Sequence, residues 1–439
     1  MSPNIPTGNE TTKQPPSNRP VFKNIGDGHR YTWGHLPGTV IELGRFRESR
    51  GDLTAEVTIY YPKPGLPNGL LSRTKLNLLS STRSRLAKDL KTRVAAVDWD
   101  TLLEQVCFIS LEYYRNGDPT IDLREVPVDG RPRWILWPYI EHGGPTILAA
   151  PGGAGKSLLA MAIAYSIAGG YALLGRMDTA PMPALYLDYE TDAGTHAERL
   201  RALAAGLGNK ELPPVFYRRM TASLTEAVSY VRKEIARLDI GFVVVDSVGY
   251  AGDGNPNDAA TALGLFRSIR ELDIPCLAVH HVRKPPAGIK ASNNIDAIYG
   301  SVYFINSARR VWQVDSTEPE EEQGVKYISL KNTKANNGRL ERTHAFRMAL
   351  ENDNNDRLTT VQLDSCRMDD IPEFVDNMSV KDRILIELRE GALDRNQLAE
   401  QLDTTPGNVS KELSQLKKRG KIVSVGSSRW GLLEASTLS

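Results

Sequence analysis

The chain has 439 residues, of which 54 are Lys or Arg and 53 are Asp or Glu, so its formal net charge is +1. With 41% hydrophobic and 24% charged residues, it has the composition of a soluble globular protein, and its length predicts roughly two to four domains. The balanced charge excludes a uniformly basic, histone-like protein, but it does not exclude local basic surfaces that bind nucleic acid.

The sequence has no pattern typical of a membrane span, a signal peptide or paired cysteines. No stretch approaches about 18 consecutive apolar residues, and the first twenty are polar and Pro-rich, so we expect neither a membrane span nor a signal peptide, and a cytoplasmic location. Cys107, Cys276 and Cys366 are too far apart in the sequence to suggest a disulfide framework or a zinc site. Residues 1–30 are too polar to bury a core, and we expect a disordered leader there.

Residues 31–130 predict an N-terminal α+β module. Alternation of apolar and polar residues over 39–61 predicts a β-hairpin, and residues 73–94 and 99–114 are typical of helices.

This module is locally basic. Between Arg45 and Arg93 there are 11 basic and 4 acidic residues, and Phe46, Tyr60 and Tyr61 lie among them. Stacking of these rings on bases makes nucleic-acid binding one function for the module, and a solvated helix face is the alternative.

Residues 131–370 predict a second, larger domain. Apolar runs of strand length alternate with helical stretches such as Ser157–Ala168 and Leu224–Leu238, which favours a parallel sheet. The expected parallel strands are Thr146–Ala149, Ala184–Leu187, Phe242–Val245 and Cys276–Val279. Residues 310–314 and 325–330 alternate, and we expect them to extend the sheet with a hairpin.

A phosphate-binding loop follows the first of these strands. The segment from Ala150 to Ser157 reads APGGAGKS, with Ala150 where the usual pattern has Gly. Its glycines allow backbone N–H groups to turn inward around phosphates at the start of a helix, Lys156 supplies charge, and the Ser157 hydroxyl is a ligand for Mg²⁺. We therefore expect ATP and Mg²⁺ as cofactors. The residues expected to contact the nucleotide are Gly152, Gly153, Ala154, Gly155, Lys156, Ser157 and Leu158.

Three other strands end in polar residues. Asp246 ends the strand at Phe242 and is expected to hold Mg²⁺. Glu190, in the segment LYLDYE, is the candidate for orienting the attacking water, with Asp188 as second choice and a structural role as the alternative for both. Of the adjacent His280 and His281, at most one points into the site, and a buried core histidine is the alternative interpretation.

Residues 376–435 predict a third domain. Three helices followed by a strand, a turn and a strand are the order of a winged helix. Lys411, Lys417 and Lys418 lie off the apolar stripe of the third helix, where they would face DNA. Docking of another protein is the alternative.

At these motifs the chain resembles the DnaB/RecA-like ATPases, and most closely the RepA-type plasmid replicative helicases. The resemblance covers about 134–347 and rests on APGGAGKS, LYLDYE, VVVDS, HHVRK, GSVYFINSARRVW and LKNTKANNG. It implies an α/β fold with a RecA-like P-loop NTPase core and a parallel central sheet. The residues that it matches to catalytic roles are Lys156, Glu190, Asp246, His281 (or His280) as γ-phosphate sensor, and Arg309 as arginine finger.

The resemblance also has implications for assembly and partners. An arginine finger completes the site of a neighbouring subunit, so we expect a homo-oligomer, by resemblance a hexameric ring. Lys334 matches a lysine that acts on the neighbouring site, and Asn336 stands where DnaB-like relatives have a second arginine. The loop after His281, with Arg283, Lys284 and Lys290, is expected to face single-stranded DNA in the central channel.

The function implied is an ATP-hydrolysing DNA translocase or helicase acting in replication of a plasmid, phage or mobile element. One alternative keeps the ATPase without unwinding, as a DNA-binding RecA/KaiC-like switch in recombination, transcription regulation or defence. Another is a non-enzymatic DNA-binding protein whose nucleotide pocket only organises oligomers.

Overall fold

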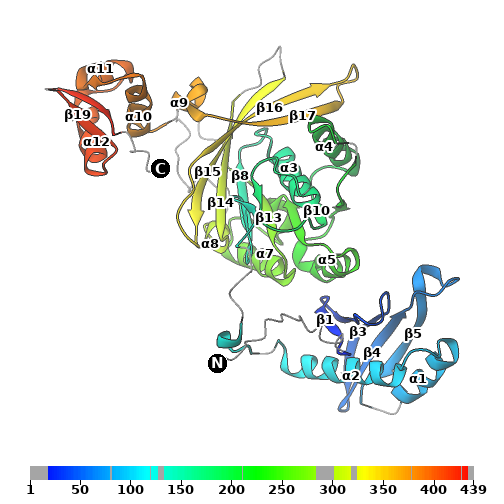
Figure 1. Cartoon of the computed structure of the whole chain (residues 1–439). Helices are drawn as coiled ribbons and strands as arrows, with labels where there is room; N and C mark the ends of the chain where they lie inside the picture. Colours follow the sequence, from blue (N-terminus) through cyan, green and yellow to red (C-terminus); the bar gives the residue numbers. More distant parts are fainter. Residues whose placement is uncertain are drawn as a thin grey trace, which may run out of the picture. The chain divides into compact units, whose positions relative to one another are not determined.

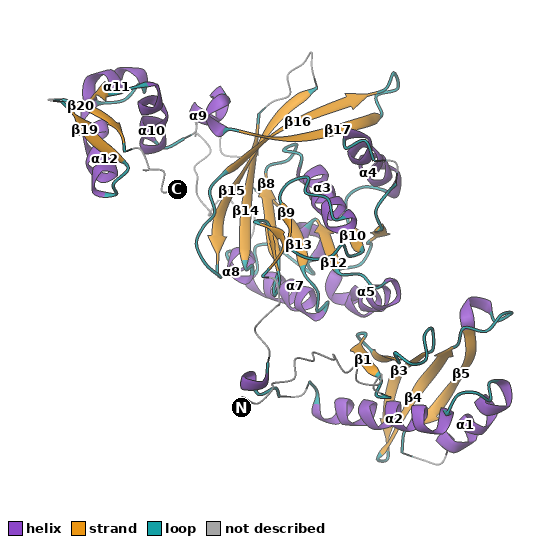
Figure 2. Ribbon diagram, in the orientation of Figure 1, coloured by secondary structure: helices purple, strands orange, loops and turns teal. Residues whose placement is uncertain are grey.

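A computed structural model describes residues 18–79, 82–118, 120–126, 133–209, 211–282, 301–317, 324–376, 378–426 and 428–433. Its elements form an N-terminal module, a central α/β core and a small C-terminal unit (Figures 1 and 2). Within these ranges, no helix combines the length and the apolar character that crossing a membrane requires.

The N-terminal module is an antiparallel sheet whose five strands are ordered as in the sequence. The strands are β1 (Val21–Asn24), β2 (Gly28–Thr32), β3 (Val40–Ser49), β4 (Asp52–Tyr60) and β5 (Leu70–Asn77). Helices α1 (Thr82–Arg93) and α2 (Trp99–Asn116) cover one face of the sheet (Figure 1). Alternate strand residues such as Ile41 and Val57 pack there against Leu103 of α2, which forms the module's core.

Two expectations for this module were wrong. Its sheet begins at Val21, inside the expected leader of residues 1–30, because the short β1 pairs with β2 although its sequence is only partly apolar. Residues 73–77 belong to β5 and not to a helix, because pairing with β4 determines their conformation. The predicted hairpin of β3 and β4 and the helix from Trp99 are confirmed.

The core contains a nine-stranded sheet in the order β11-β10-β12-β13-β8-β14-β15-β16-β17. Its strands are β8 (Thr146–Ala150), β10 (Ala184–Asp188), β11 (Val215–Arg219), β12 (Phe242–Asp246), β13 (Cys276–His281), β14 (Arg310–Ser316), β15 (Val325–Ala335), β16 (His344–Asn352) and β17 (Leu358–Cys366). The strands from β11 to β14 are parallel and the last three are antiparallel. The predicted parallel strands and the β14–β15 hairpin are confirmed.

Helices connect these strands. They are α3 (Lys156–Gly169), α4 (Ala193–Gly206), α5 (Leu224–Leu238), α6 (Val248–Ala251), α7 (Ala259–Glu271) and α8 (Tyr303–Ser307). The core also contains a small second sheet, which consists of β6 (Trp134–Trp137), β7 (Ile140–Glu141) and β9 (Arg176–Met177). Helix α3 is buried along nearly its whole length because it packs on β8, β10, β12 and β13, and this packing fixes the position of its N-terminus.

The C-terminal unit has its own small core. Its elements are α10 (Val380–Glu390), β18 (Leu393–Asp394), α11 (Arg395–Gln401), α12 (Pro406–Lys418), β19 (Ile422–Val425) and β20 (Arg429–Leu432). The short α9 (Pro372–Asp376) precedes them and packs instead against the core sheet, where Phe374 clusters with Ala345 of β16. Asp394 and Gln397 form the predicted capping box at the start of α11, and Thr405 caps α12. The apolar stripe of α12, for example Leu413, is buried against Ile384 of α10.

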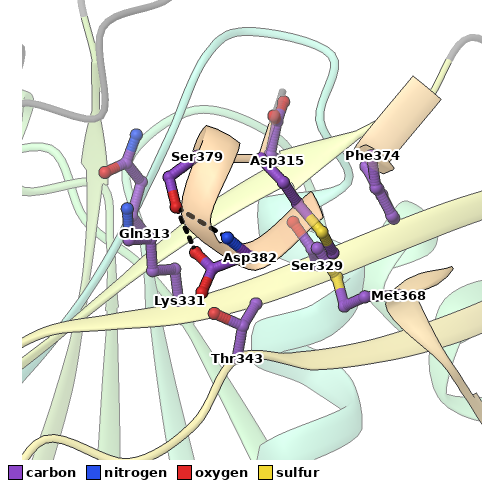
Figure 3. A pocket seen from close by; sticks show the side chains of 10 residues that line it. Gln313, Asp315, Ser329, Lys331, Thr343, Met368, Phe374, Ser379 and Asp382 are labelled. Atoms are coloured by element: carbon purple, nitrogen blue, oxygen red, sulfur yellow. Dashed lines mark hydrogen bonds between the residues drawn. The ribbon is translucent and has the colours of Figure 1, made fainter. Parts of the chain in front are cut away.

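A pocket of about 300 Å³, lined by both polar and apolar side chains, lies beside β14 and β15. Figure 3 shows Gln313, Asp315, Ser329 and Lys331 around it, and also Ser379, whose hydroxyl oxygen accepts the N–H of Asp382 at 3.2 Å at the start of α10. None of the residues predicted to bind nucleotide lines this pocket.

Candidate active site

The phosphate loop runs from the end of β8 into α3. Gly153 and Gly155 have φ values of 81° and 85°, which glycine adopts without strain. A Cβ added at Gly152 or Gly153 would meet no atom within 4 Å, so there is open space beside both residues. Lys156, 6% exposed, donates from Nζ to the carbonyl oxygen of Pro151 at 2.8 Å. Burial lowers the pKa of Lys156, an effect that the carboxylates of Asp246 and Glu190 oppose. Open space beside the glycines, the Lys156 ammonium group and the N-terminus of α3 fit a polyphosphate.

Asp246 and Ser157 are the residues of this site whose oxygen atoms could hold a metal ion. Asp246, 3% exposed, accepts hydrogen bonds from the Tyr186 hydroxyl at 2.6 Å and from the Ser157 side chain. Burial raises its pKa, because the ionised carboxylate has lost water. A carboxylate and a hydroxyl beside a phosphate site fit Mg²⁺, which takes one or two protein ligands and completes its shell with phosphate oxygens and water. In the described part of the chain, no group of three or more His, Cys, Asp or Glu side chains forms a metal cage.

Asp188 and Glu190 are placed very differently. Asp188 is 1% exposed and accepts the N–H groups of Glu190 and Thr191 at 3.1 and 3.2 Å. It also accepts the hydroxyls of Thr191 and Tyr217 at 3.0 and 3.1 Å, and these bonds hold its pKa below the ordinary value despite burial. Its oxygens are therefore occupied by the turn that follows β10. Glu190 is half-exposed, so it is the carboxylate free to contact a water molecule.

His281 and Ser247 hold the Glu190 carboxylate. His281 Nε2 lies 3.1 Å from Glu190 Oε1, and the Ser247 hydroxyl donates to the same oxygen. His280 instead is buried, contacts Phe304, and its Nδ1 lies 2.8 Å from the carbonyl oxygen of His281. Burial lowers the pKa of His280 to about 4, so it is neutral at physiological pH. Of the two histidines, the structure places His281 in the site.

The arrangement suits hydrolysis of a phosphoanhydride. A bound Mg²⁺ ion would be held by Asp246 and Ser157 and would neutralise charge on the phosphates. Lys156 and the N-terminus of α3 would hold the transferred phosphoryl group. Glu190 would accept a proton from a water molecule, and the contacts with His281 and Ser247 fix the direction of its carboxylate.

Arg309 lies at the opposite edge of the sheet from this loop. Its N–H donates to Pro145 at 2.9 Å, just before β8, whereas the phosphate loop follows the other end of that strand. A five-residue strand is roughly 16 Å long. The Arg309 side chain is exposed and packs over Gly144, where an added Cβ would collide with it. Arg309 is therefore remote from its own phosphate loop and accessible from outside.

Arg310, the next residue, is buried, in contrast to the exposed Arg309. It is 1% exposed and donates from Nε to Glu141 at 3.0 Å and from Nη1 to Asn332 at 2.9 Å. Its guanidinium also lies 4.6 Å from the centre of the Trp134 ring. Arg310 is thus a core residue that anchors the start of β14.

Lys334 is fully engaged within its own chain. Its Nζ donates to the carbonyl oxygens of Ile305, Asn306 and Ala308 at 2.7, 3.0 and 2.7 Å, which uses all three ammonium donors. Burial, together with the charge of Arg309, lowers its pKa. A contact with a neighbouring site, as the resemblance implies, requires these bonds to break. In this structure Lys334 holds the end of α8, directly before Arg309.

The predicted DNA-contacting lysines of α12, Lys411, Lys417 and Lys418, are all exposed, and Lys417 lies 5.4 Å from the centre of the Trp430 ring. Arg283, Lys284 and Lys290 lie outside the described residues.

Three residues of the site were not found from the sequence. Tyr186 and Ser247 contact the carboxylates of Asp246 and Glu190, respectively, and Lys326 of β15 donates to the Gly153 carbonyl at 2.7 Å. For Tyr186 the sequence did contain a signal, because this residue belongs to the LYLDYE motif and lies two positions before Asp188. Lys326 has none, because its contact arises from the order of strands in the sheet.

The mostly parallel sheet, with a phosphate loop between β8 and α3, gives the core a RecA-like P-loop fold. Residues 120–287 match a protein family described as an AAA domain, which agrees with an ATPase. A comparison with curated proteins gave no match. Among solved structures, a KaiC-like protein from the hyperthermophilic archaeon Pyrococcus horikoshii OT3 is 14% identical, with a TM-score of 0.35, over 51% of this chain and 91% of that one. That likeness is too distant to add to the assignment.

Proposed function

We propose that the protein is an ATP-driven, ring-forming translocase or helicase that acts on single-stranded DNA, in replication of a plasmid, phage or mobile element. The observation that carries the proposal is the position of Arg309, exposed and about one strand length from the phosphate loop of its own chain. An arginine there serves catalysis only in a neighbouring subunit, and such head-to-tail contacts close into rings. We propose a hexamer on the resemblance to RepA-type helicases.

The DNA contacts in this proposal come from two places. The loop after His281, with Arg283, Lys284 and Lys290, would follow the strand in the central channel, next to the histidine that senses the γ-phosphate. The C-terminal unit would act as a winged helix, with the exposed Lys411, Lys417 and Lys418 of α12 against duplex DNA.

Complementation between two inactive variants tests the shared site. Arg309→Ala is expected to bind ATP with unchanged affinity but to lose about 10³–10⁵-fold in turnover. Glu190→Gln lacks the base but retains the arginine. Mixing the two proteins should restore part of the activity, since some interfaces then combine an intact Glu190 with an intact Arg309. Mixtures that remain inactive would argue against active sites shared between subunits.

Unwinding of a forked duplex with ATP tests the helicase function itself. Strand separation on one fork polarity is the expected result. If both polarities fail while single-stranded DNA still stimulates ATP hydrolysis, the protein is a DNA-dependent ATPase switch that does not unwind.

A further inference from the structure

The sheet of the N-terminal module contains a groove lined mainly by charged side chains. Helices α1 and α2 cover one side of the sheet, and the other side contains a groove of about 360 Å³. Its lining comes from three adjacent strands: Arg45, Arg47, Glu56, Arg73, Thr74 and Lys75.

A β-bulge directs two of these side chains into the groove. Gly44 pairs with Glu56 and Arg47 pairs with Thr54. Two residues of β3, Arg45 and Phe46, therefore lie opposite a single residue of β4. This extra residue reverses the alternation along β3: Phe46 packs towards the helices, where its ring lies 5.8 Å from Tyr114, and its neighbours Arg45 and Arg47 face the open side. Arg45 has φ 54°, a left-handed conformation that is uncommon for a non-glycine residue. The backbone thus adopts a costly conformation that places two arginines on one face.

The groove is strongly cationic. Four basic side chains and one acidic one give a local charge of +3. Glu56 lies between Arg45 and Arg73, at 3.1 and 3.8 Å, and holds both guanidinium groups in place. Arg47 and Lys75 are exposed and, within the residues that the structure describes, neither side chain has an ion-pair partner.

We propose that this groove binds the phosphate backbone of single-stranded DNA. Its lining has no aromatic or large apolar side chain, so it offers charge without a surface for stacking. Phe46 and Tyr61, which the sequence suggested for stacking on bases, pack against the module's own core. Cations spread over three strands, which are roughly 4.8 Å apart, fit an extended polyanion better than a single small anion. The contact is therefore electrostatic and independent of sequence. The choice of single-stranded DNA as the polyanion rests on the proposed function.

The test compares two charge reversals in the full chain. Arg47→Glu/Lys75→Glu changes the groove, and Lys88→Glu/Lys91→Glu makes the same change in charge at exposed positions of α1, on the covered side of the sheet. Fluorescence anisotropy with a labelled oligo-dT strand measures affinity over a range of salt concentrations. The groove variant should bind at least about tenfold more weakly at low salt and the control within about twofold of wild type. The salt slope should fall by about 0.7 for each cation removed.

Thermal unfolding and DNA-independent ATP hydrolysis should be unchanged in both variants. If the groove variant unfolds early, Arg47→Gln/Lys75→Gln replaces it, with the same expected loss in salt slope, because it removes the same two cations, and a smaller loss in affinity. Equal losses in the groove variant and the control would overturn the inference, as would a loss confined to duplex DNA. Wild-type protein that binds no DNA would instead contradict the proposed function.

Discussion

The ammonium group of Lys326 lies 2.7 Å from the carbonyl oxygen of Gly153, so a side chain from β15 holds the outside of the phosphate loop. In a trans peptide the C=O and N–H point in opposite directions. A cation on the Gly153 oxygen therefore directs the N–H of Ala154 inward, where it lies 3.4 Å from the Pro151 oxygen that also accepts Lys156. The loop is thus shaped from a strand remote in sequence.

Lys326→Met should weaken ATP binding about tenfold. A hydrogen bond to a charged group contributes about 1.5–3 kcal/mol, and its loss leaves the loop N–H groups less well ordered. Titration with a fluorescent ATP analogue measures this, and Lys326→Arg should recover part of the affinity. Lys331→Met, on the same strand but lining the pocket of Figure 3, is the control. Equal affinities for Lys326→Met and the control would contradict the positioning role.

Glu190→Gln and Asp188→Asn should fail in different ways. Glu190 is half-exposed and directed by His281, so its loss should lower turnover by about 10²–10⁴-fold with ATP affinity and melting temperature unchanged. Asp188 accepts four hydrogen bonds, so the amide should lower stability by about 1–3 kcal/mol. Calorimetry and single-turnover hydrolysis separate the two. A stable, inactive Asp188→Asn protein would make Asp188 the base.

Much of this site was predictable because its residues belong to local patterns. Strand, glycine-rich loop and helix follow one another around Lys156, and Asp246 ends an apolar run. The sequence ranked Glu190 above Asp188, and the resemblance favoured His281 over His280. The reason for each choice is visible only in the structure, because it depends on which of these side chains the neighbouring residues engage. The contacts of Lys326 and Lys334 come from pairing of β14 with β15, and only the sheet order reveals which loops those strands reach.

Asp246→Asn should stabilise the protein while abolishing Mg²⁺-dependent hydrolysis. Burial raises the folded-state pKa of Asp246 above its unfolded value, so the ionised carboxylate opposes folding. That cost is present in full above the folded pKa and disappears below the unfolded pKa, so stability falls as pH rises through this window. The amide removes the cost and should raise the melting temperature at pH 7 by roughly 2–4 °C for each kcal/mol removed. The difference should shrink as pH is lowered. A less stable variant at neutral pH would show that the ionised carboxylate stabilises the fold without metal.

Lys334→Met should lower turnover without changing ATP affinity. The substitution removes three hydrogen bonds that hold the end of α8 before Arg309. A displacement of about 1 Å in a catalytic group can cost about 10²-fold in rate. Steady-state kinetics give kcat and KM separately, and Lys334→Arg should retain part of kcat. Glu190→Gln subunits carry an intact Lys334 and Arg309, so adding them should raise the activity of Lys334→Met protein. If it does not, the defect of Lys334→Met does not lie in the position of Arg309.

Substitutions of the adjacent residues Arg309 and Arg310 should have different effects: the first should lower the rate of hydrolysis and the second the stability of the fold. Arg310→Met leaves Glu141 buried with the half-exposed Arg133, at 3.6 Å, as its remaining cation, and breaking such a pair costs about 3–5 kcal/mol. Chemical denaturation should show that loss, and none for Arg309→Ala, whose side chain is exposed. Hydrolysis should fail in Arg309→Ala although its fold is intact. The contrary result is an Arg309→Ala protein that is as unstable as Arg310→Met and keeps its turnover. That result would make Arg309 a structural residue of the core and would contradict its role in a neighbouring active site.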